Sequence, residues 1–418
     1  MTRAGPSQDE IRRQNLGALL RHVHLGGPTS RAELTTMMGL NRSTIMALTA
    51  DLTAAGLVRE ELPREKRRAG RPSLVVRPES SMVYVLAFDI GVDRLVAARV
   101  GLGGVILDRR ETVRPRGPFV LEDVVGALAG FSRQMLGRAR SGAVCVGVGV
   151  AVSGGVRSGD GVLRYSPNMG ANDVPLGAEL SRRLALGVPV VVGNDANLGA
   201  LAEQARGVGV NSRDLVYLHG DVGVGGGVIV SGRLLSGHGG YGGEIGHMVV
   251  NAGGRPCGCG SRGCLESEVG ERALLEAAGR FGTQVGRDAV RSVVDAADRG
   301  DVVAQEALTR VGDWLGLGVA NLVNIFNPEI VIFGGTLREI YLGAAAQVRS
   351  RITTDVLSAS REALRLRTPL LGDDTTLVGA AELAFDQVLA DPLDTLSRAG
   401  AAPAAMVAKA GGLPAGGG

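Results

Sequence analysis

A histidine and three cysteines are the residues whose types and spacing most directly indicate chemistry. His247 is followed ten positions later by Cys257, and then by Cys259 and Cys264. One imidazole and three thiolates complete a tetrahedral zinc site, and a ligand set with no open position is typical of a structural metal. The remaining cysteine, Cys145, lies in an apolar run. The alternative is a group of buried or redox-active thiols near an unrelated histidine, but clustered thiols in a reducing compartment favour a metal.

Acidic side chains flank this motif and could bind a polyhydroxylated ligand. Glu244 precedes His247 in the segment Gly-Glu-Ile-Gly-His, and Glu266 follows Cys264 by two positions. A hexose presents a ring of hydroxyl groups, each both donor and acceptor, which carboxylates and amides that converge in a cleft can satisfy. For any one of these carboxylates, a solvated loop position or a helix cap remains the alternative.

The elements that must position these residues alternate between short β-branched runs and helices from about residue 81 onward. This alternation predicts an α/β architecture, and two separated glycine-rich loops indicate two lobes around a cleft. The predicted strands are Val83–Ile90, Leu95–Val100, Val144–Val152, Val188–Val192, Leu215–His219, Val228–Val230 and Ile330–Phe333. Residues 393–418 contain mostly Ala, Gly and Pro, and we expect them to form a disordered tail.

The first 80 residues predict a separate module. Apolar spacing and turn residues indicate three helices and two short strands, over Glu10–His24, Ser30–Gly39, Asn41–Gly56, Leu57–Val58 and Leu74–Val76. Ser30 and Glu33 have the spacing of a capping box, and Asn41 can cap the third helix. This order is typical of a winged helix-turn-helix.

The charge of this module points to a polyanion. Residues 1–80 hold 13 Arg or Lys against 8 Asp or Glu, whereas the whole chain has a net charge of only +3. The third helix of a helix-turn-helix enters the major groove, so its first turn is predicted to meet base edges through Arg42, Ser43 and Thr44. The wing residues predicted to contact phosphates are Arg67, Arg68 and Arg71. The alternative is a small helical interaction domain with a solvated basic loop.

The Gly-Glu-Ile-Gly-His segment, combined with the Cys-x-Cys-x4-Cys motif, resembles the ROK family (repressor, open reading frame, kinase) over about residues 10–385. The resemblance implies an actin-like, ribonuclease-H-like sugar kinase fold of two α/β lobes, preceded by the winged helix of the family's regulators. It also implies these boundaries: a DNA-binding domain at 1–80, a first lobe at 81–195 completed by the helix near 375–392, a second lobe with the zinc motif at 196–374, and the tail.

The same resemblance assigns roles to individual residues. Those that match sugar contacts are Asn168, Asn194, Asp195, Glu244, His247 and Glu266. Asp195 matches the catalytic base of the kinases. A zinc-bound His247 can still offer its other ring nitrogen to the sugar, which would tie the metal to the binding site.

Both phosphate-binding loops depart from the kinase pattern. Kinases of the family read Asp-x-Gly-Gly-Thr after the first strand, whereas this chain has Val92 and Asp93 at the last two positions. The second loop, Gly-Thr-Gly in the kinases, is Asp221-Val222-Gly223 here. Each loop loses a hydroxyl and gains a carboxylate that would repel phosphate, so ATP is not expected as a cofactor.

We therefore expect a sugar-responsive transcriptional regulator, most simply a repressor of carbohydrate metabolism, with structural zinc. Its expected partners are a double-stranded DNA operator, a sugar or sugar derivative, and a second copy of the chain in a homodimer or homotetramer. One alternative is a regulator that still phosphorylates its sugar, and another is a regulator whose body binds a protein. No run reaches the roughly 20 apolar residues of a membrane helix, and residues 1–10 lack a secretory signal, so we expect a cytoplasmic protein.

Overall fold

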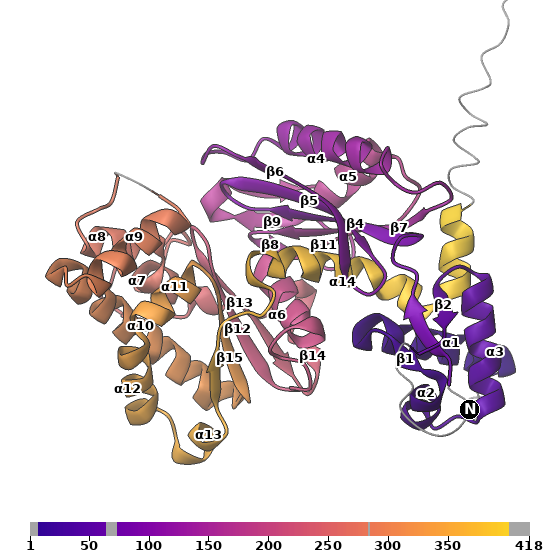
Figure 1. Cartoon of the computed structure of the whole chain (residues 1–418). Helices are drawn as coiled ribbons and strands as arrows, with labels where there is room; N and C mark the ends of the chain where they lie inside the picture. The colour runs from indigo at the N-terminus through magenta and orange to yellow at the C-terminus, as the bar shows by residue number, and fades with distance from the viewer. Residues whose placement is uncertain (1–6, 64–72, 283–284, 401–418) are drawn as a thin grey trace, which may run out of the picture.

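The computed structural model of the chain describes residues 7–63, 73–282 and 285–400, which form an N-terminal unit and two α/β lobes (Figure 1). In its described part, the N-terminal unit (residues 7–80) has three helices and an antiparallel sheet of order β1-β3-β2. Its elements are α1 (Gln8–Gly26), β1 (Thr29–Ser30), α2 (Arg31–Met38), α3 (Arg42–Ala54), β2 (Val58–Glu61) and β3 (Val75–Pro78). The predicted helices and the two predicted strands are confirmed, and the two strands pair with each other.

Side chains fix the starts of α2 and α3 as the sequence predicts. The Ser30 hydroxyl accepts the Glu33 N–H at 3.2 Å, and the Glu33 carboxylate accepts the Ser30 N–H at 2.8 Å. The Asn41 side chain accepts the Thr44 N–H at 2.8 Å. These bonds satisfy backbone donors that have no partner within the helix. The proposed wing residues Arg67, Arg68 and Arg71 lie outside the described residues.

The first lobe is built on a five-stranded sheet of order β11-β7-β4-β5-β6. Its strands are β4 (Val83–Ile90), β5 (Arg94–Gly101), β6 (Val105–Val113), β7 (Val144–Val152) and β11 (Val190–Asn194). Every residue of β4 is buried because helices cover both faces of the sheet. These are α4 (Leu121–Leu136) and α5 (Leu176–Leu184) on one side and α14 (Thr375–Ala390) on the other (Figure 1).

The second lobe repeats this plan with a sheet of order β14-β13-β12-β15-β16. Its strands are β12 (Leu215–Gly220), β13 (Val224–Val230), β14 (Arg233–Leu234), β15 (Ile330–Gly335) and β16 (Arg365–Arg367). Its helices are α7 (Leu265–Val269), α8 (Glu271–Ala277), α9 (Arg287–Asp298), α10 (Val302–Phe326), α11 (Thr336–Gly343), α12 (Ala345–Asp355) and α13 (Ser358–Glu362). The two sheets share one pairing pattern. From the first strand of each lobe, β4 or β12, two successive antiparallel pairings lead to one edge of the sheet and two successive parallel pairings lead to the other edge. The expected fold requires this pattern.

Helix α6 (Asp195–Arg206) lies between the lobes, packed against β12, β13 and α14. The buried apolar residues of the N-terminal unit, such as Leu19 and Leu52, belong to the same cluster as Val85 and Phe385 of the first lobe. The second lobe has its own cluster. The N-terminal unit is therefore packed onto the first lobe rather than joined to it by a linker alone.

The C-terminal segment corrects one prediction. Residues 392–400 form a helix, whereas the sequence analysis places the start of a disordered tail at residue 393. Leu396 packs against the first-lobe core, and Ala399 is only 5% exposed. Burial of so few apolar atoms leaves little signal in the composition, which explains the error. Residues 401–418 lie outside the described residues.

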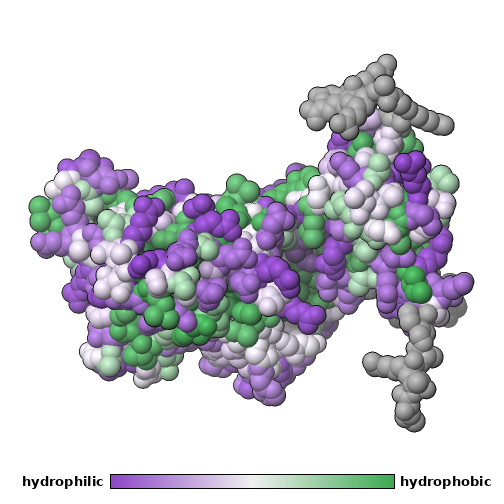
Figure 2. All heavy atoms as spheres, turned by 90° about the horizontal axis from the view of Figure 1, so that it is seen from below, coloured by the Kyte–Doolittle hydropathy of each residue, from purple (hydrophilic) through white to green (hydrophobic). Residues whose placement is uncertain are grey.

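The surface seen from below mixes polar and apolar side chains over both the N-terminal unit and the lobes (Figure 2). Among the described residues, no helix combines the length and the apolar character needed to cross a membrane.

Candidate functional site

A cavity between the two lobes brings together all the residues that the sequence analysis matched to sugar contacts. The first-lobe side contributes Asn168, Asn194 and Asp195, and the second-lobe side contributes Glu244, His247 and Glu266. These side chains are carboxylates, amides and one imidazole, so the cavity presents both donors and acceptors to a ligand. The two lobes, which share one topology, therefore bring their polar side chains together in this cavity.

The corner between β11 and α6 positions two of these residues. The side-chain oxygen Oδ1 of Asn194 accepts the Asn197 N–H at 3.0 Å, which caps α6, while the side-chain amide nitrogen donates to the Gly154 carbonyl at 3.0 Å. One N–H of the Asn194 amide remains for a ligand. Asp195 begins α6, and its carboxylate accepts the Ala196 N–H at 2.7 Å.

Electrostatics at this corner favour a protonated acid. Burial raises the pKa of Asp195 to about 8, and the nearby carboxylates of Asp89, Asp221 and Glu244 add to the rise. Burial likewise raises the pKa of Asp221 to about 6. At neutral pH Asp195 is therefore mainly an uncharged carboxyl group that can donate a hydrogen bond to a hydroxyl.

The opposite wall depends on a glycine. The Glu266 carboxylate accepts the Val224 N–H at 3.0 Å, which holds it beside the loop that precedes β13. A Cβ atom on Gly223 would collide with the Glu266 carboxylate and the Asn168 amide. The glycine thus lets a carboxylate and an amide from different lobes approach each other across the loop.

The four predicted metal ligands also meet. Their ligand atoms all lie within 4.8 Å of one another, with 3.6 Å between Cys257 Sγ and His247 Nδ1 and 3.8 Å between the sulfurs of Cys259 and Cys264. Tetrahedral zinc with bonds of about 2.3 Å to sulfur separates two sulfurs by about 3.8 Å, so the spacing and the donor types fit zinc. Because Nδ1 faces Cys257, the Nε2 atom of His247 is left for the cavity.

Sequence reasoning missed several further residues of the cavity wall, among them Tyr165 and His219. Tyr165 in β9 (Leu163–Ser166) hydrogen-bonds Glu244, and burial together with this carboxylate raises its pKa. His219 at the end of β12 has its Nδ1 atom 3.2 Å from the Tyr217 hydroxyl, and burial lowers its pKa to about 3. Both are isolated in the sequence, and nothing in their spacing marks them as part of a site.

The acidic substitution in the first phosphate loop is compensated, which revises the interpretation that its charge simply repels phosphate. Arg116 donates to the Asp93 carboxylate at 2.8 Å and, through both terminal nitrogens, to the Glu271 carboxylate at 3.0 Å. Glu271 starts α8, so this bridge links the two lobes. Arg94 lies 3.3 Å from the buried Asp89 carboxylate. The sequence shows these arginines but does not predict which carboxylates they pair with.

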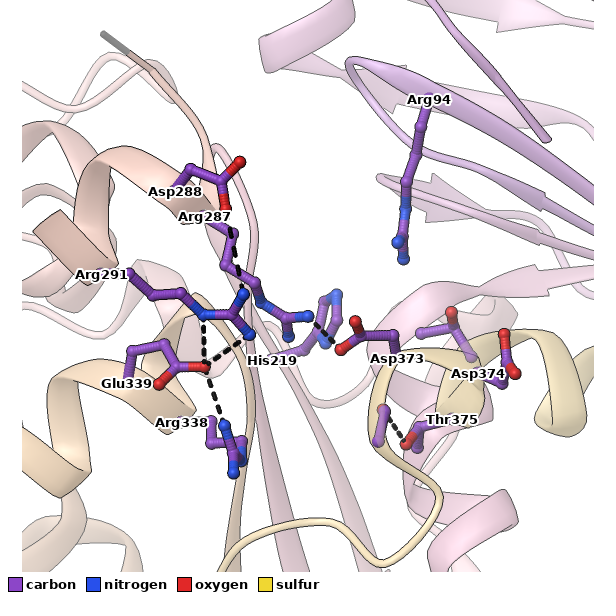
Figure 3. A network of polar contacts seen from close by, with 12 residues as sticks. Arg94, His219, Arg287, Asp288, Arg291, Arg338, Glu339, Asp373, Asp374 and Thr375 are labelled. Carbon is purple, nitrogen blue, oxygen red and sulfur yellow. Dashed lines mark hydrogen bonds and ion pairs between the residues drawn. The ribbon is translucent and has the colours of Figure 1, made fainter.

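Further ion pairs cross the same region (Figure 3). Arg287 of α9 pairs with Asp373, which lies just before α14. Arg291 and Arg338 both pair with Glu339 of α11, at 3.3 and 2.8 Å. Arginines thus occupy the space between α9, α11 and the start of α14, already neutralised by carboxylates.

The predicted base-reading turn is accessible. Arg42 and Ser43 are exposed at the start of α3 and Thr44 is half-buried, whereas the opposite face packs inward through Ile45 and Leu48. The first turn of α3 therefore presents polar side chains to solvent while the rest of the helix anchors it.

Comparison with known proteins identifies the family. The family model described as the ROK family matches residues 85–387. The chain belongs to the ROK family. The match spans both lobes, including the cavity and the Cys/His cluster.

Transcriptional regulators are among the similar proteins. The xylose repressor of Bacillus subtilis is 28% identical over 384 residues, which cover 91% of this chain and 97% of that protein. A crystal structure of a ROK family transcriptional regulator, a homologue of the E. coli MLC protein, aligns with a TM-score of 0.76 at 25% identity and covers 94% of this chain and 99% of that one.

Kinases are also among the similar proteins. The glucokinase of Thermotoga maritima is 32% identical over 323 residues, covering 73% of this chain and 98% of that protein. The Streptomyces griseus ROK glucokinase, solved with glucose and AMPPNP, has a TM-score of 0.61 and 28% identity over 72% of this chain and 99% of its own. The regulators therefore match the chain nearly end to end, whereas these kinases match a smaller share of it.

Proposed function

We propose that this ROK-family protein is a sugar-responsive transcriptional repressor that binds operator DNA through its N-terminal unit and an aldose in the cavity between the lobes. The observation that carries the proposal is the union, in one chain, of an exposed polar turn on α3 and a cavity lined by six sugar-compatible polar residues. The near full-length similarity to a xylose repressor supports the same pairing of functions.

On DNA, α3 acts as the recognition helix of a winged helix-turn-helix. Arg42, with Ser43 and Thr44, reads base edges in the major groove, because these residues occupy the exposed first turn of the helix. Arg67, Arg68 and Arg71 contact phosphates. A two-fold symmetric assembly of the chain would read a roughly palindromic operator, one half-site for each copy.

In the cavity, hydroxyl groups of the sugar replace water on converging polar groups. Glu244, Glu266 and the free nitrogen of His247 accept or donate on one side, and Asn168, Asn194 and protonated Asp195 do so on the other. The test ligands are D-xylose and D-glucose, because xylose repressors and glucokinases are both similar to this chain.

A structural zinc ion held by His247 and the three cysteines would supply a rigid anchor. Its effect on this chain would be to fix the His247 ring, and with it the segment that carries Glu244 and Glu266, in the orientation that faces the sugar. The ligand spacing and the absence of an open position in the ligand set support a structural role.

Retained sugar kinase activity is the competing function, because Asp195 has the tuned pKa of a general base. Against it, Arg94 and Arg116 pair with carboxylates in the region where the first phosphate loop lies, and the loop hydroxyls are lost. ATP consumption in the presence of D-glucose, measured on freshly purified protein, separates the two functions.

The decisive experiment selects bound duplexes from a random pool with the full chain and then titrates the enriched duplex with and without D-xylose or D-glucose. We expect one enriched, roughly palindromic sequence whose affinity changes with a sugar in the absence of ATP. Failure to enrich any sequence, or a response that requires ATP, contradicts the proposal.

A further inference from the structure

A buried polar cluster joins the N-terminal unit to the first lobe, away from the cavity. His24, in the last turn of α1, is fully buried. Its Nδ1 atom accepts the Gly103 N–H at 2.9 Å, and its Nε2 atom lies 3.0 Å from the Glu382 carboxylate of α14. Arg206, the last residue of α6, donates to the same carboxylate and, at 3.0 Å, to the Gly103 carbonyl. We call His24, Gly103, Arg206 and Glu382 the joint cluster.

Polar contacts hold the His24 ring of the joint cluster at both nitrogens. The Gly103 N–H donates to Nδ1, and Nε2 lies 3.0 Å from the Glu382 carboxylate and 2.7 Å from Nη2 of Arg206. Burial lowers the pKa of His24, in agreement with a neutral ring, although Glu382 acts in the opposite direction. The Arg206 and Glu382 side chains are only 13% and 10% exposed, so loss of either partner would leave a buried charge unpaired.

Helix α6 connects the joint cluster to the cavity. Asp195 at its first position lines the cavity, and Arg206 at its last position belongs to the joint cluster. A helix of 12 residues covers about 17 Å, so one rigid element spans this distance.

Helix α14 makes the same connection beside it and runs toward the N-terminal unit (Figure 1). Near the start of α14, the Thr376 hydroxyl donates at 2.9 Å to Asp89, whose charge acts on Asp195 of the cavity wall. Further along α14, Glu382 belongs to the joint cluster. A Cβ atom on Gly379 would collide with the Leu198 backbone of α6. Such close contact makes α6 and α14 move together.

We propose that the joint cluster transmits the state of the cavity to the DNA-binding unit, with His24 and Arg206 as positioning residues. This inference rests on the proposed function. A sugar that engages Asp195 acts on the first turn of α6, and the helix carries the displacement to Arg206. Because the joint cluster is buried and its hydrogen bonds are directional, it can re-form only if α1 moves together with Arg206. A movement of α1 changes the orientation of α2 and α3.

The test uses the full chain and measures how strongly D-xylose or D-glucose changes affinity for the selected duplex. His24→Leu removes the three polar contacts of the ring and places an apolar side chain in the buried position. We expect a change of about 5- to 150-fold in the wild type and less than about twofold in His24→Leu, with sugar binding to the DNA-free protein retained. His24→Gln, whose amide can accept from Gly103 and donate to Glu382, should restore part of the response. A structural defect alone would weaken DNA binding equally with and without sugar.

Arg21→Leu is the matched control. It removes an ion pair of 2.9 Å with Asp386 between the same two helices, but at the surface, where both side chains are largely exposed. It should keep the wild-type response. If His24→Leu does not fold, Glu382→Gln carries the test. A full wild-type response in His24→Leu, or in Glu382→Gln where it takes its place, overturns the inference, whereas a wild type that ignores both sugars overturns the proposed function itself.

Discussion

Replacement of Asp195 by Asn tests the electrostatics of the cavity directly. The carboxyl group has a pKa of about 8 in the folded protein and an ordinary value of 3.8 in the unfolded chain. At pH 7 the folded group is therefore about 0.9 protonated and the unfolded group almost fully ionised, so unfolding releases about 0.9 of a proton from this residue. Asn cannot release one.

The sign of the effect on stability follows from the same values. A pKa raised by folding stabilises the protein below pH 3.8, and this contribution is lost as the pH rises through about 8. Between these limits the free energy of unfolding falls by about 1.4 kcal/mol per pH unit on account of this one group. Asp195→Asn should therefore flatten the pH dependence by that amount.

Proton release on mixing with urea, followed at constant pH in weak buffer, measures the effect without assuming two-state unfolding. We expect wild type to release about 0.9 of a proton more than Asp195→Asn at pH 7. Asp221→Asn is the matched control, because a pKa of about 6 predicts a difference of only about 0.1 at pH 7 and about 0.5 at pH 6. Equal release from wild type and Asp195→Asn would mean that the folded protein holds Asp195 ionised, and the reasoning would fail.

Three other predictions concern separate parts of the molecule. Cys259→Ser should abolish metal binding, which elemental analysis of freshly purified protein would detect. It should also increase hydrogen exchange around His247 and the three cysteines but not in the N-terminal unit. Zinc at one ion per chain in this variant would contradict the ligand assignment. Arg42→Ala should cost about 1–3 kcal/mol on the selected duplex and relax its base preference, as titration on selected and random DNA would reveal; an equal loss on both would assign Arg42 to phosphate instead. Gly223→Ala should push the Glu266 and Asn168 side chains apart and weaken sugar binding at least tenfold, or about 1.4 kcal/mol. Calorimetry that shows an unchanged sugar affinity would mean that these two side chains do not bind the sugar.

Local patterns in the sequence determined the three helices of the N-terminal unit. Ser30, Glu33 and Asn41 specify helix starts through bonds to backbone groups a few residues away, and such bonds depend on spacing alone. The four residues predicted to bind a metal were equally readable, since all fall within 18 residues and a tetrahedral ion accepts few other donor sets.

Tertiary structure alone decided the features that depend on long-range packing. Burial raises the pKa of Asp195, and the carboxylates of Asp89, Asp221 and Glu244 add to the rise, so the shift exists only in the folded protein and cannot be read from one carboxylate in the sequence. The helix at residues 392–400 is stabilised by burial against the first lobe, and the composition of this segment does not predict that burial.

The joint cluster is the clearest case. His24, Arg206 and Glu382 are separated by up to 358 positions, and each alone resembles an ordinary surface residue. The sequence determined which groups can hydrogen-bond, because that property belongs to each side chain. Only the packing of α1, α6 and α14 determined that these groups meet out of water, where an unpaired charge is costly and one arrangement is favoured.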